Sequence, residues 1–596
     1  MKLFAILPLL LASTLAYGQA APDTVFFHGD ILTGVGLNAN SSNTPQHVTA
    51  LAITAGKITA TGTDPEVLKL ANDRTTKIDL HGAFVMPGFN DAHTHIASAG
   101  QQRLSVDLDG TKSLAEMQQR IKDYAAKAAP GQWILGGGWD HTKWPSKALP
   151  TRQDLDAVTA GHPTLLYRTD GHIAIANTAA LTAAGITAKT TSPAGGKIDL
   201  DAQGELTGII REAPAMALIE PHIPKPTMAV RRQALTLALD DALAHGVTSV
   251  QDFSDWDDFL ALESLERDGQ LHVRVSEWLT FNDPIETLKA HQASHDRNDP
   301  MLHTGMLKGF MDGSLGSRTA ALAGPYTDDP ANSGLPRYDQ TKLNAMTIER
   351  AAAGFQIGFH AIGDRANTMA LTAFEAVDED VKKQNECRPV GEGAAKRVTC
   401  PSPRRPASLY RFRIEHAQVL LPADFDRFAK LHIIASMQPV HLLTDMAWAT
   451  DRIGPERAKY AYAWKSFLNH GVTLAFGTDY PVESINPMRG FYSAITRQNE
   501  ADTMTFQPQE KLTINEAIFA YTQGSAFAEN AEKKKGRLEP GYYADLVVLD
   551  RDITKATPQE LLHTKVLRTV VAGQTVYTGS ATTSAESPHW RAPDAD

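Results

Sequence analysis

The residues with the clearest chemical potential are two histidines, His93 and His95, in the segment PGFNDAHTHI. This segment follows an apolar stretch that we expect to be a strand and includes a Pro-Gly pair. Residues two apart on a strand point to the same face, so both imidazoles can reach one metal ion. A His-X-His pair also occurs by chance, so it needs support from other residues.

Three further potential metal ligands occupy similar positions later in the chain. His360 closes GFQIGFHAIGD, His416 closes RFRIEHAQ, and Asp479 closes VTLAFGTDYPV. Parallel barrel strands bring their carboxyl ends to one face, where barrel enzymes have their active sites. A single buried histidine is usually a hydrogen-bonded core residue, but five such groups at strand ends indicate a site.

The elements that would position these residues form an α/β pattern. Helical patterns alternate with short apolar segments, which is typical of parallel βα units. Segments 244–250 (AHGVTSV) and 469–475 (NHGVTLA) each read as a helix end, a glycine cap and a strand. Eight strands predict a (β/α)8 TIM barrel. The candidates lie near Phe84–His95, Val247–Asp252, His272–Leu279, Met306–Asp312, Gln356–His360, Phe412–His416, Ile433–Gln438 and Val472–Asp479.

A large insertion follows the first barrel strand. About 150 residues separate the first strand candidate from the second, far more than an ordinary connection. We expect the insertion, at about 100–230, to form a lid or subdomain over the barrel mouth. Its residues Trp139, Asp140 and Trp144 would either line the pocket or form the core of the insertion itself.

Both chain ends carry short strand patterns around glycine turns, at 24–36, 50–61, 537–550 and 566–579. They predict a small β-sandwich domain built from both chain ends. The predicted boundaries are a signal peptide at 1–20, the sandwich at 21–84 and 531–580, the barrel at 85–530, and a loose tail at 581–596.

The composition favours small-molecule chemistry. The chain has 596 residues, of which 42% are hydrophobic and 21% charged, and its formal charge is −11. This balance is typical of a soluble globular protein. No basic face or interleaving of aromatic and basic residues stands out, so we expect no nucleic-acid partner.

The N-terminus predicts export. Lys2 precedes the apolar run LFAILPLLLASTLAY, which is followed by small residues, as in a signal peptide cleaved after Ala20 or, alternatively, after Gly18. The run is too short to span a membrane, so we expect a periplasmic or secreted protein with no stable membrane anchor. Cys387 and Cys400 lie close together, and in an oxidising compartment they predict one local disulfide.

With these motifs in view, the chain resembles the amidohydrolase superfamily, and within it the amidohydrolase-3 group (YtcJ-like and N-substituted formamide deformylase-like). The resemblance covers nearly the whole mature chain. It rests on VMPGFNDAHTH, GGGWDHTKWP, YRTDGHIAIANTAAL, MDGSLGSRTAAL, HAIGDRAN, RIEHAQ, GTDYPV and GRLEPGYYADLVVLD. It implies a metal site formed by His93, His95, His360, His416 and Asp479.

The fourth strand supplies Lys308, where many members of the superfamily use a carbamylated lysine or a glutamate to bridge two metals. A lysine beside cations and away from water has a lowered pKa, so its neutral amine can capture carbon dioxide. The alternative is an ordinary lysine paired with a carboxylate such as Asp312. We therefore expect one or two ions, with a carbamylated Lys308 if two are bound.

The implied reaction is hydrolysis of a non-peptide carbon–nitrogen bond. Imidazole and carboxylate ligands favour zinc, which lowers the pKa of bound water. Asp479 would accept the proton of the water and later donate it to the leaving nitrogen. His172 and Arg318 are candidate substrate contacts through the resemblance and their Gly-rich loops. They could equally be a turn-capping histidine and a surface ion pair.

Two other functions remain open. One is a deaminase or cyclic-imide hydrolase on the same scaffold, which the metal site does not distinguish. The other is a non-catalytic metal-binding or regulatory protein, against which the intact ligand set argues. The expected partners are a small-molecule amide substrate and, as a possibility, a second copy of the chain in a homodimer.

Overall fold

The computed structural model describes most of the chain, namely residues 21–37, 44–168, 171, 173–193, 196–386, 388–390, 397–399 and 409–579. The predicted signal peptide, the Cys387–Cys400 pair, His172 and the tail lie outside these ranges. Within them, no helix combines the length and apolar character that crossing a bilayer requires.

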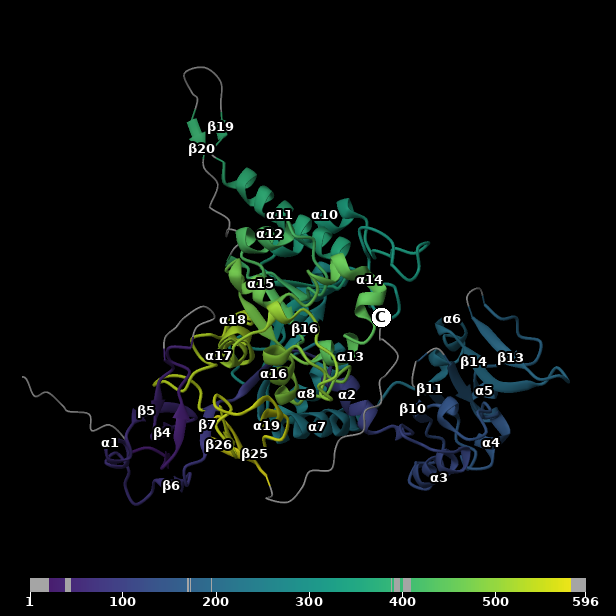
Figure 1. Ribbon diagram of the computed structural model, residues 1–596, viewed down its shortest axis with the longest axis horizontal. Coiled ribbons are helices and arrows are strands. Elements are labelled where there is room, and N and C mark those ends of the chain that lie inside the picture. The colour runs from purple at the N-terminus through teal and green to yellow at the C-terminus, as the bar shows by residue number, and fades with distance from the viewer. Residues whose placement is uncertain are drawn as a thin grey trace, which may run out of the picture.

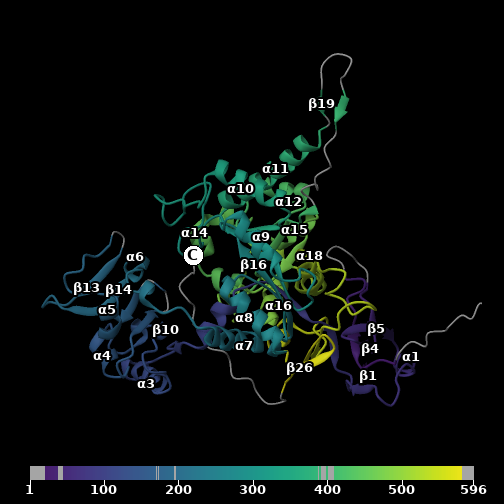
Figure 2. The same cartoon turned by 180° about the vertical axis from the view of Figure 1, so that it is seen from behind.

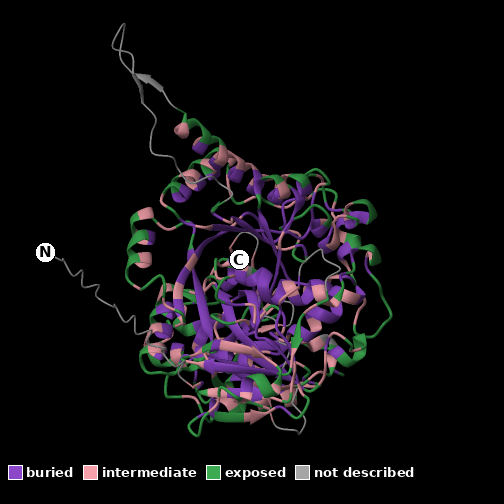
Figure 3. Ribbon diagram, turned by 90° about the vertical axis from the view of Figure 1, so that its left-hand side faces the viewer, coloured by how far each residue is buried: buried purple, intermediate pink, exposed green. Residues whose placement is uncertain are grey.

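The centre of the molecule is an eight-stranded sheet whose neighbouring strands are all parallel. This arrangement confirms the predicted (β/α)8 barrel. Figure 3 shows its strands buried within a layer of helices whose outward faces are exposed. In spatial order the strands are β8 (Phe89–Thr94), β15 (Val247–Asp252), β16 (Arg274–Thr280), β17 (Leu302–Phe310), β18 (Ile357–Ala361), β21 (Arg413–His416), β22 (Ile434–Met437) and β23 (Leu474–Phe476).

Helices connect and cover these strands. The principal ones are α7 (Met228–Ala244), α8 (Trp256–Arg267), α9 (Ile285–Ala293), α10 (Gln340–Ala352), α11 (Asp364–Asn385), α12 (Asp424–Leu431), α13 (His441–Asp445), α14 (Ala449–Ala458), α15 (Trp464–Asn469), α16 (Pro487–Thr496), α17 (Ile514–Phe519), α18 (Ser525–Ala528) and α19 (Pro558–Leu562). A short hairpin of β19 (Arg388–Val390) and β20 (Arg397–Thr399) follows α11. Gly246 after α7 and Gly471 after α15 have φ of 78° and 76°, as the predicted glycine caps require.

The seam of the barrel lies between its first strand, β8, and its last, β23. Hydrogen bonds outside the regular strand pairing close this seam. The Asp479 N–H donates to the His93 carbonyl at 2.8 Å. The Asp91 carboxylate accepts the backbone N–H and the hydroxyl of Thr478 at 3.0 and 2.6 Å. Closure of the barrel therefore places Asp479, which follows the last strand, directly beside β8.

The predicted first strand, 84–95, divides between two sheets. Its first part, β7 (Phe84–Pro87), pairs with β2 (Asp30–Leu32) and β24 (Leu546–Leu549), whereas β8 belongs to the barrel. Gly88 separates the two parts. A Cβ added there would lie 2.3 Å from the Thr248 side chain, so only glycine lets the chain pass β15 at this point.

Two small sheets form the predicted sandwich. One contains β5 (Lys57–Gly62), β4 (Ala50–Thr54), β1 (Thr24–Phe27) and β6 (Thr76–Asp79), with α1 (Asp64–Leu68) beside it. The other contains β26 (Gln574–Thr578), β25 (Val566–Val571), β24, β7, β2 and β3 (His47–Val48). A shared core that includes Phe26, Ile31, Leu51 and Leu546 joins them. Figure 1 shows the two chain ends, purple and yellow, meeting at this side of the barrel.

The insertion runs between α2 (Ile96–Arg103) and α7, and it folds around a sheet of its own. The sheet contains β13 (Lys197–Leu200), β14 (Leu206–Arg211), β12 (Ile173–Ala176), β11 (Thr164–Arg168), β10 (Ile134–Trp139) and β9 (Val106–Asp107). The helices on it are α3 (Leu114–Ala125), α4 (Arg152–Asp156), α5 (Thr178–Ala183) and α6 (Ala213–Met216).

The insertion stands apart from the barrel in both views (Figures 1 and 2). It therefore does not form the expected lid over the mouth in this structure. The physical reason is that it has two apolar cores of its own, one on each side of its sheet. Trp139 and Trp144 are buried in one of these cores, so they belong to the core of the insertion rather than to a pocket wall.

Candidate metal centre

A cavity of about 240 Å³ opens at the carboxyl ends of the barrel strands. It brings together residues from six strands or the segments that follow them. Its polar lining includes His95, Lys308, His360, His416, His441 and Asp479. Its apolar wall is formed by Phe310, Leu315, Ile362, Trp448 and Val482. None of its lining residues comes from the described part of the insertion.

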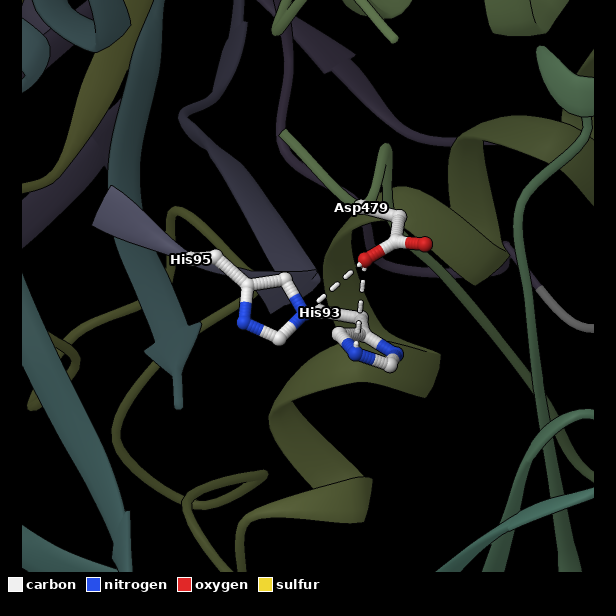
Figure 4. Close-up of side chains that lie close together, drawn as sticks. All are labelled: His93, His95 and Asp479. Atoms are coloured by element: carbon white, nitrogen blue, oxygen red, sulfur yellow. Dashed lines mark ion pairs between the residues drawn. The ribbon is translucent and has the colours of Figure 1, made fainter. Parts of the chain in front are cut away.

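His93 and His95 lie at the end of β8 and face the Asp479 carboxylate (Figure 4). Their Nε2 atoms are 3.6 and 3.1 Å from Asp479 Oδ1. The other ring nitrogens have partners: His93 Nδ1 is 3.0 Å from Glu415 Oε2, and His95 Nδ1 is 3.0 Å from the Phe253 carbonyl. Because these oxygens accept, each Nδ1 carries a proton, and each Nε2 is the ring nitrogen that faces Asp479.

Asp479 follows β23 in the left-handed region, with φ of 60°. This conformation, rare for a non-glycine residue, turns its carboxylate into the cavity. Burial alone would raise the pKa of Asp479, but contact with His95 and the charges of the neighbouring histidines outweigh it and hold the pKa below its usual range. The carboxylate is therefore ionised, and its Oδ1 lies 3.1 Å from His95 Nε2.

His416 also has positive φ, 70°, and its ring lies 5.0 Å from that of His93. Its Nδ1 donates to Gln438 Oε1 at 2.8 Å, which leaves Nε2 with a lone pair. Burial lowers the pKa of both His93 and His416. Neutral imidazoles are the form that binds metals.

His360 is oriented differently. Its Nε2 lies 3.3 Å from the Gly313 carbonyl and 3.6 Å from Asp312 Oδ1, although its ring is 4.6 Å from that of His416. Burial and the charge of Lys308 lower the pKa of His360 to about 3, so it is neutral. The structure thus places His360 in the cavity but does not turn its Nε2 toward Asp479.

Lys308 is buried, with 1% of its surface exposed, and its Nζ lies 2.8 Å from His93 Nε2. The ammonium donates to the lone pair that a metal would use. The carboxylate proposed as its alternative partner, Asp312, accepts three backbone N–H groups at 2.8 to 3.0 Å, from Ala321, Ile362 and Gly363.

His441 is a residue that the sequence analysis missed. It begins α13, four positions after β22 ends, and its Nε2 lies 3.6 Å from Asp479 Oδ2. That nitrogen is buried without a hydrogen-bond partner among the described residues. The signal in the sequence was a histidine just beyond the seventh strand, in MQPVHLLTD.

Glu415 was also missed, although it precedes His416 directly. It is fully buried, contacts His93, and is held by Arg413, whose Nε lies 2.5 Å from Glu415 Oε1. Arg413 also donates to the Ala92 carbonyl and to Ser436 Oγ, both at 2.7 Å. The buried Arg413–Glu415 pair thus orients the His93 ring through its Nδ1.

Two groups of three residues have donor atoms that fit a divalent cation. They are His93, His95 and Asp479, and His416, His441 and Asp479; within each group the donor atoms lie within 4.8 Å of one another. Asp479 is common to both. Two imidazoles and a carboxylate are ligands that zinc accepts. The donor set therefore fits a metal, and it has room for one or two ions.

Two of the remaining sequence candidates, Arg318 and Asp140, lie outside the cavity. Arg318 forms an ion pair with Asp328 at 3.0 Å, which Arg452 also contacts, so the structure places it in the surface ion pair given as its alternative. Asp140 pairs with Arg168 at 2.9 Å within the insertion. His172 lies outside the described residues.

Comparison with known proteins supports one family. A model described as "Amidohydrolase family" matches residues 76–577. Protein LONG AFTER FAR-RED 3 of Arabidopsis thaliana is 34% identical, covering 92% of this chain and 91% of that protein. Putative amidohydrolase YtcJ of Bacillus subtilis (strain 168) is 32% identical, with coverages of 89% and 96%.

Two further similarities are informative. N-substituted formamide deformylase of Arthrobacter pascens is 26% identical, covering 89% of this chain and 95% of that protein. A crystal structure of an uncharacterized metal-dependent hydrolase from Pyrococcus horikoshii OT3 has a TM-score of 0.72 and 29% identity, covering 90% of this chain and 99% of that one.

Proposed function

Because the chain belongs to the amidohydrolase family, we propose that it is a metal-dependent hydrolase that cleaves a non-peptide carbon–nitrogen bond. The observation that carries this proposal is the convergence of three histidine Nε2 atoms, from His93, His95 and His441, on one ionised carboxylate, Asp479. One relative is named N-substituted formamide deformylase, and a formamide contains such a bond.

His93, His95, His416, His441 and Asp479 would hold the cation. When bound, a divalent cation acidifies water and polarises a carbonyl group. Asp479 would accept the proton of the attacking water, because its lowered pKa keeps it ionised and it lines the cavity. It would then deliver that proton to the leaving nitrogen. The apolar wall, with Phe310 and Trp448, would pack against the substrate and exclude bulk water.

We also propose that Lys308 is carbamylated in the active protein. Its neutral amine would attack carbon dioxide, forming an N–C bond and releasing one proton to solvent, which leaves an anionic carbamate. The ammonium form contacts His93 Nε2 at 2.8 Å and would repel a cation there. The carbamate would instead add a second negative group beside Asp479, enough to support two ions.

A substrate screen tests the function. Zinc-loaded protein is offered N-formyl amines, N-acyl amino acids, aryl amides, cyclic amides and aminated heterocycles, and product is measured by mass spectrometry. We expect turnover of open-chain amides, lost on chelation and restored by zinc. Release of ammonia from heterocycles without amide turnover would favour a deaminase. No turnover by zinc-loaded, folded protein on any class would contradict the proposal.

A further inference from the structure

We propose a second cation site, remote from the catalytic cavity, formed by Glu266, His295 and Asp299. Glu266 lies near the end of α8, whereas His295 and Asp299 lie in the segment that joins α9 to β17. One donor atom from each lies within 4.8 Å of the other two. The site takes a divalent cation that accepts both imidazole and carboxylate ligands, such as Zn²⁺ or Mn²⁺.

His295 is oriented as a metal ligand would be. Its Nδ1 lies 3.1 Å from Glu263 Oε1, so this nitrogen donates its proton to a carboxylate. Its Nε2 is buried and has no hydrogen-bond partner among the described residues, and the side chain is only 12% exposed. The edge-to-face contact with Phe259, at 5.4 Å between centroids, fixes the ring plane.

The distances from His295 Nε2 are those of donors that share an ion. Glu266 Oε2 lies 3.8 Å away and Asp299 Oδ2 lies 3.9 Å away. Both are too long for hydrogen bonds. Two donors at about 2.1 Å from one cation, separated by an angle of about 110–130°, would lie about 3.4–3.8 Å apart. A small inward movement of the carboxylates would complete such a geometry.

Asp299 is held by the backbone at its other oxygen. Its Oδ1 accepts the N–H groups of Met301 and Leu302 at 2.7 and 3.2 Å, which leaves Oδ2 facing His295. His295 thus has a partner that orients it and a buried Nε2 without a hydrogen-bond partner among the described residues, whereas Asp299 is oriented by the backbone and lies beside Glu266. Such supporting contacts are typical of metal sites.

The charges of the cluster also favour a cation. Three carboxylates surround one imidazole here: Glu263, Glu266 and Asp299 each have an oxygen within 3.9 Å of a His295 ring nitrogen. A divalent cation would offset the negative charges of these carboxylates.

This site lies at the opposite end of the barrel from the catalytic cavity. Asp299 precedes β17, whereas Lys308 and Phe310, near the other end of that strand, line the cavity. The nine positions between Asp299 and Lys308 span about 30 Å of extended chain. A cation there would not touch substrate; it would tie α8 to the start of the strand that carries Lys308.

Zinc stoichiometry of the full chain tests the proposal. Chelated wild-type protein, His295→Gln and Glu266→Gln are titrated with Zn²⁺ alone, and bound metal is measured by native mass spectrometry. We expect each variant to bind one equivalent fewer than the wild type. Glu286→Gln, a matched change at a carboxylate 80% exposed on α9, should bind as the wild type does.

Hydrogen exchange shows which part of the chain the zinc ion protects. Because it is also measured on the wild type, it tests the proposal even if a variant folds poorly. In the wild type, Zn²⁺ should slow exchange in peptides spanning 260–268 and 294–302, and this protection should be absent from a folded His295→Gln or Glu266→Gln. Equal zinc content in the wild type and both variants, or no zinc-dependent protection of these peptides in the wild type, would overturn the proposal.

Discussion

At the scale of single residues, Asp479 is the carboxylate common to both groups of potential ligands. Its left-handed backbone and its position at the barrel seam bring one carboxylate within 3.6 Å of His93, His95 and His441. A carboxylate in this position can bind a cation with one oxygen and exchange a proton with the other. These two roles can be separated by a substitution that keeps the shape and removes the charge.

Replacing Asp479 with Asn should reduce kcat by at least about 100-fold, because an amide cannot accept the proton of the water. Its effect on folding should be small, since Asn has nearly the same volume. Steady-state kinetics and urea unfolding measure the two quantities. Asp328→Asn, the same chemical change in the Arg318 ion pair outside the cavity, is the control. Full activity in Asp479→Asn would remove this residue from the mechanism.

His441→Ala should weaken zinc binding about 10–100-fold, a loss typical of removing a group that supports a metal site. The reason is that its Nε2 faces Asp479 Oδ2 and has no other partner among the described residues. Competition with a fluorescent zinc chelator measures the affinity. His470→Ala changes a histidine with 38% of its side chain exposed and serves as the control. Equal affinities in the His441→Ala and control proteins would show that His441 is no ligand.

Lys308→Ala should lose one metal per chain, and short carboxylic acids should partly restore activity by replacing the carbamate. In the wild type, added bicarbonate should speed the recovery of activity after metal removal. Metal analysis and a mass increase equal to one carbon dioxide on the Lys308 peptide are the measurements. One metal per active chain, an unmodified Lys308 and no effect of bicarbonate would together indicate a mononuclear enzyme.

At the scale of the elements, the passage from β7 to β8 depends on one glycine. Gly88→Ala would place a methyl group 2.3 Å from Thr248, so we expect it to lower the free energy of unfolding by about 1–3 kcal/mol. Gly324→Ala, where nothing lies within 4 Å of the added carbon, should have little effect. Urea unfolding compares the two, and Thr248→Ala should recover part of the loss. Equal stabilities of the Gly88→Ala and Gly324→Ala proteins would mean that the backbone near Gly88 can move without a loss of stability.

The sequence predicted the barrel strands well because each is an apolar run bounded by a helix end and a polar residue. It did not predict that 84–95 serves two sheets, because both parts are extended and buried and only the close contact at Gly88 separates them. His441 and Glu415 were missed for a related reason. His441 lies in a helix that begins beyond a strand. Glu415 directly precedes the predicted ligand His416, and its contact with His93 is visible only in the folded barrel, which brings β8 and β21 together.

At the scale of the whole molecule, the two chain ends share one sandwich, and the insertion stands apart with its own cores. The position of the insertion relative to the barrel could not be predicted from the sequence. The hydrophobic pattern shows that a segment can form its own core, but it does not show where that segment lies in the molecule. The export prediction concerns residues outside the described ranges and remains a proposal.

If the chain is exported, protein recovered from the periplasm of a Gram-negative host should begin near Ala21 and contain a Cys387–Cys400 crosslink. The loop that the crosslink closes is short, so its contribution to stability should be about 3 kcal/mol or less. N-terminal sequencing and intact mass under non-reducing conditions measure both features. Two free thiols in the recovered protein would refute the crosslink, and an intact leader would refute cleavage.

The seam between β8 and β23 has a consequence for how the chain folds while it is being synthesised. A ribosome releases His93 and His95 nearly four hundred residues before Asp479. Until the last strand emerges, the sheet is an open curve with unpaired edges, a form that associates readily with other chains. It also lacks the carboxylate on which both groups of ligands depend. A product truncated before Asp479 therefore lacks the carboxylate that both groups of proposed ligands share.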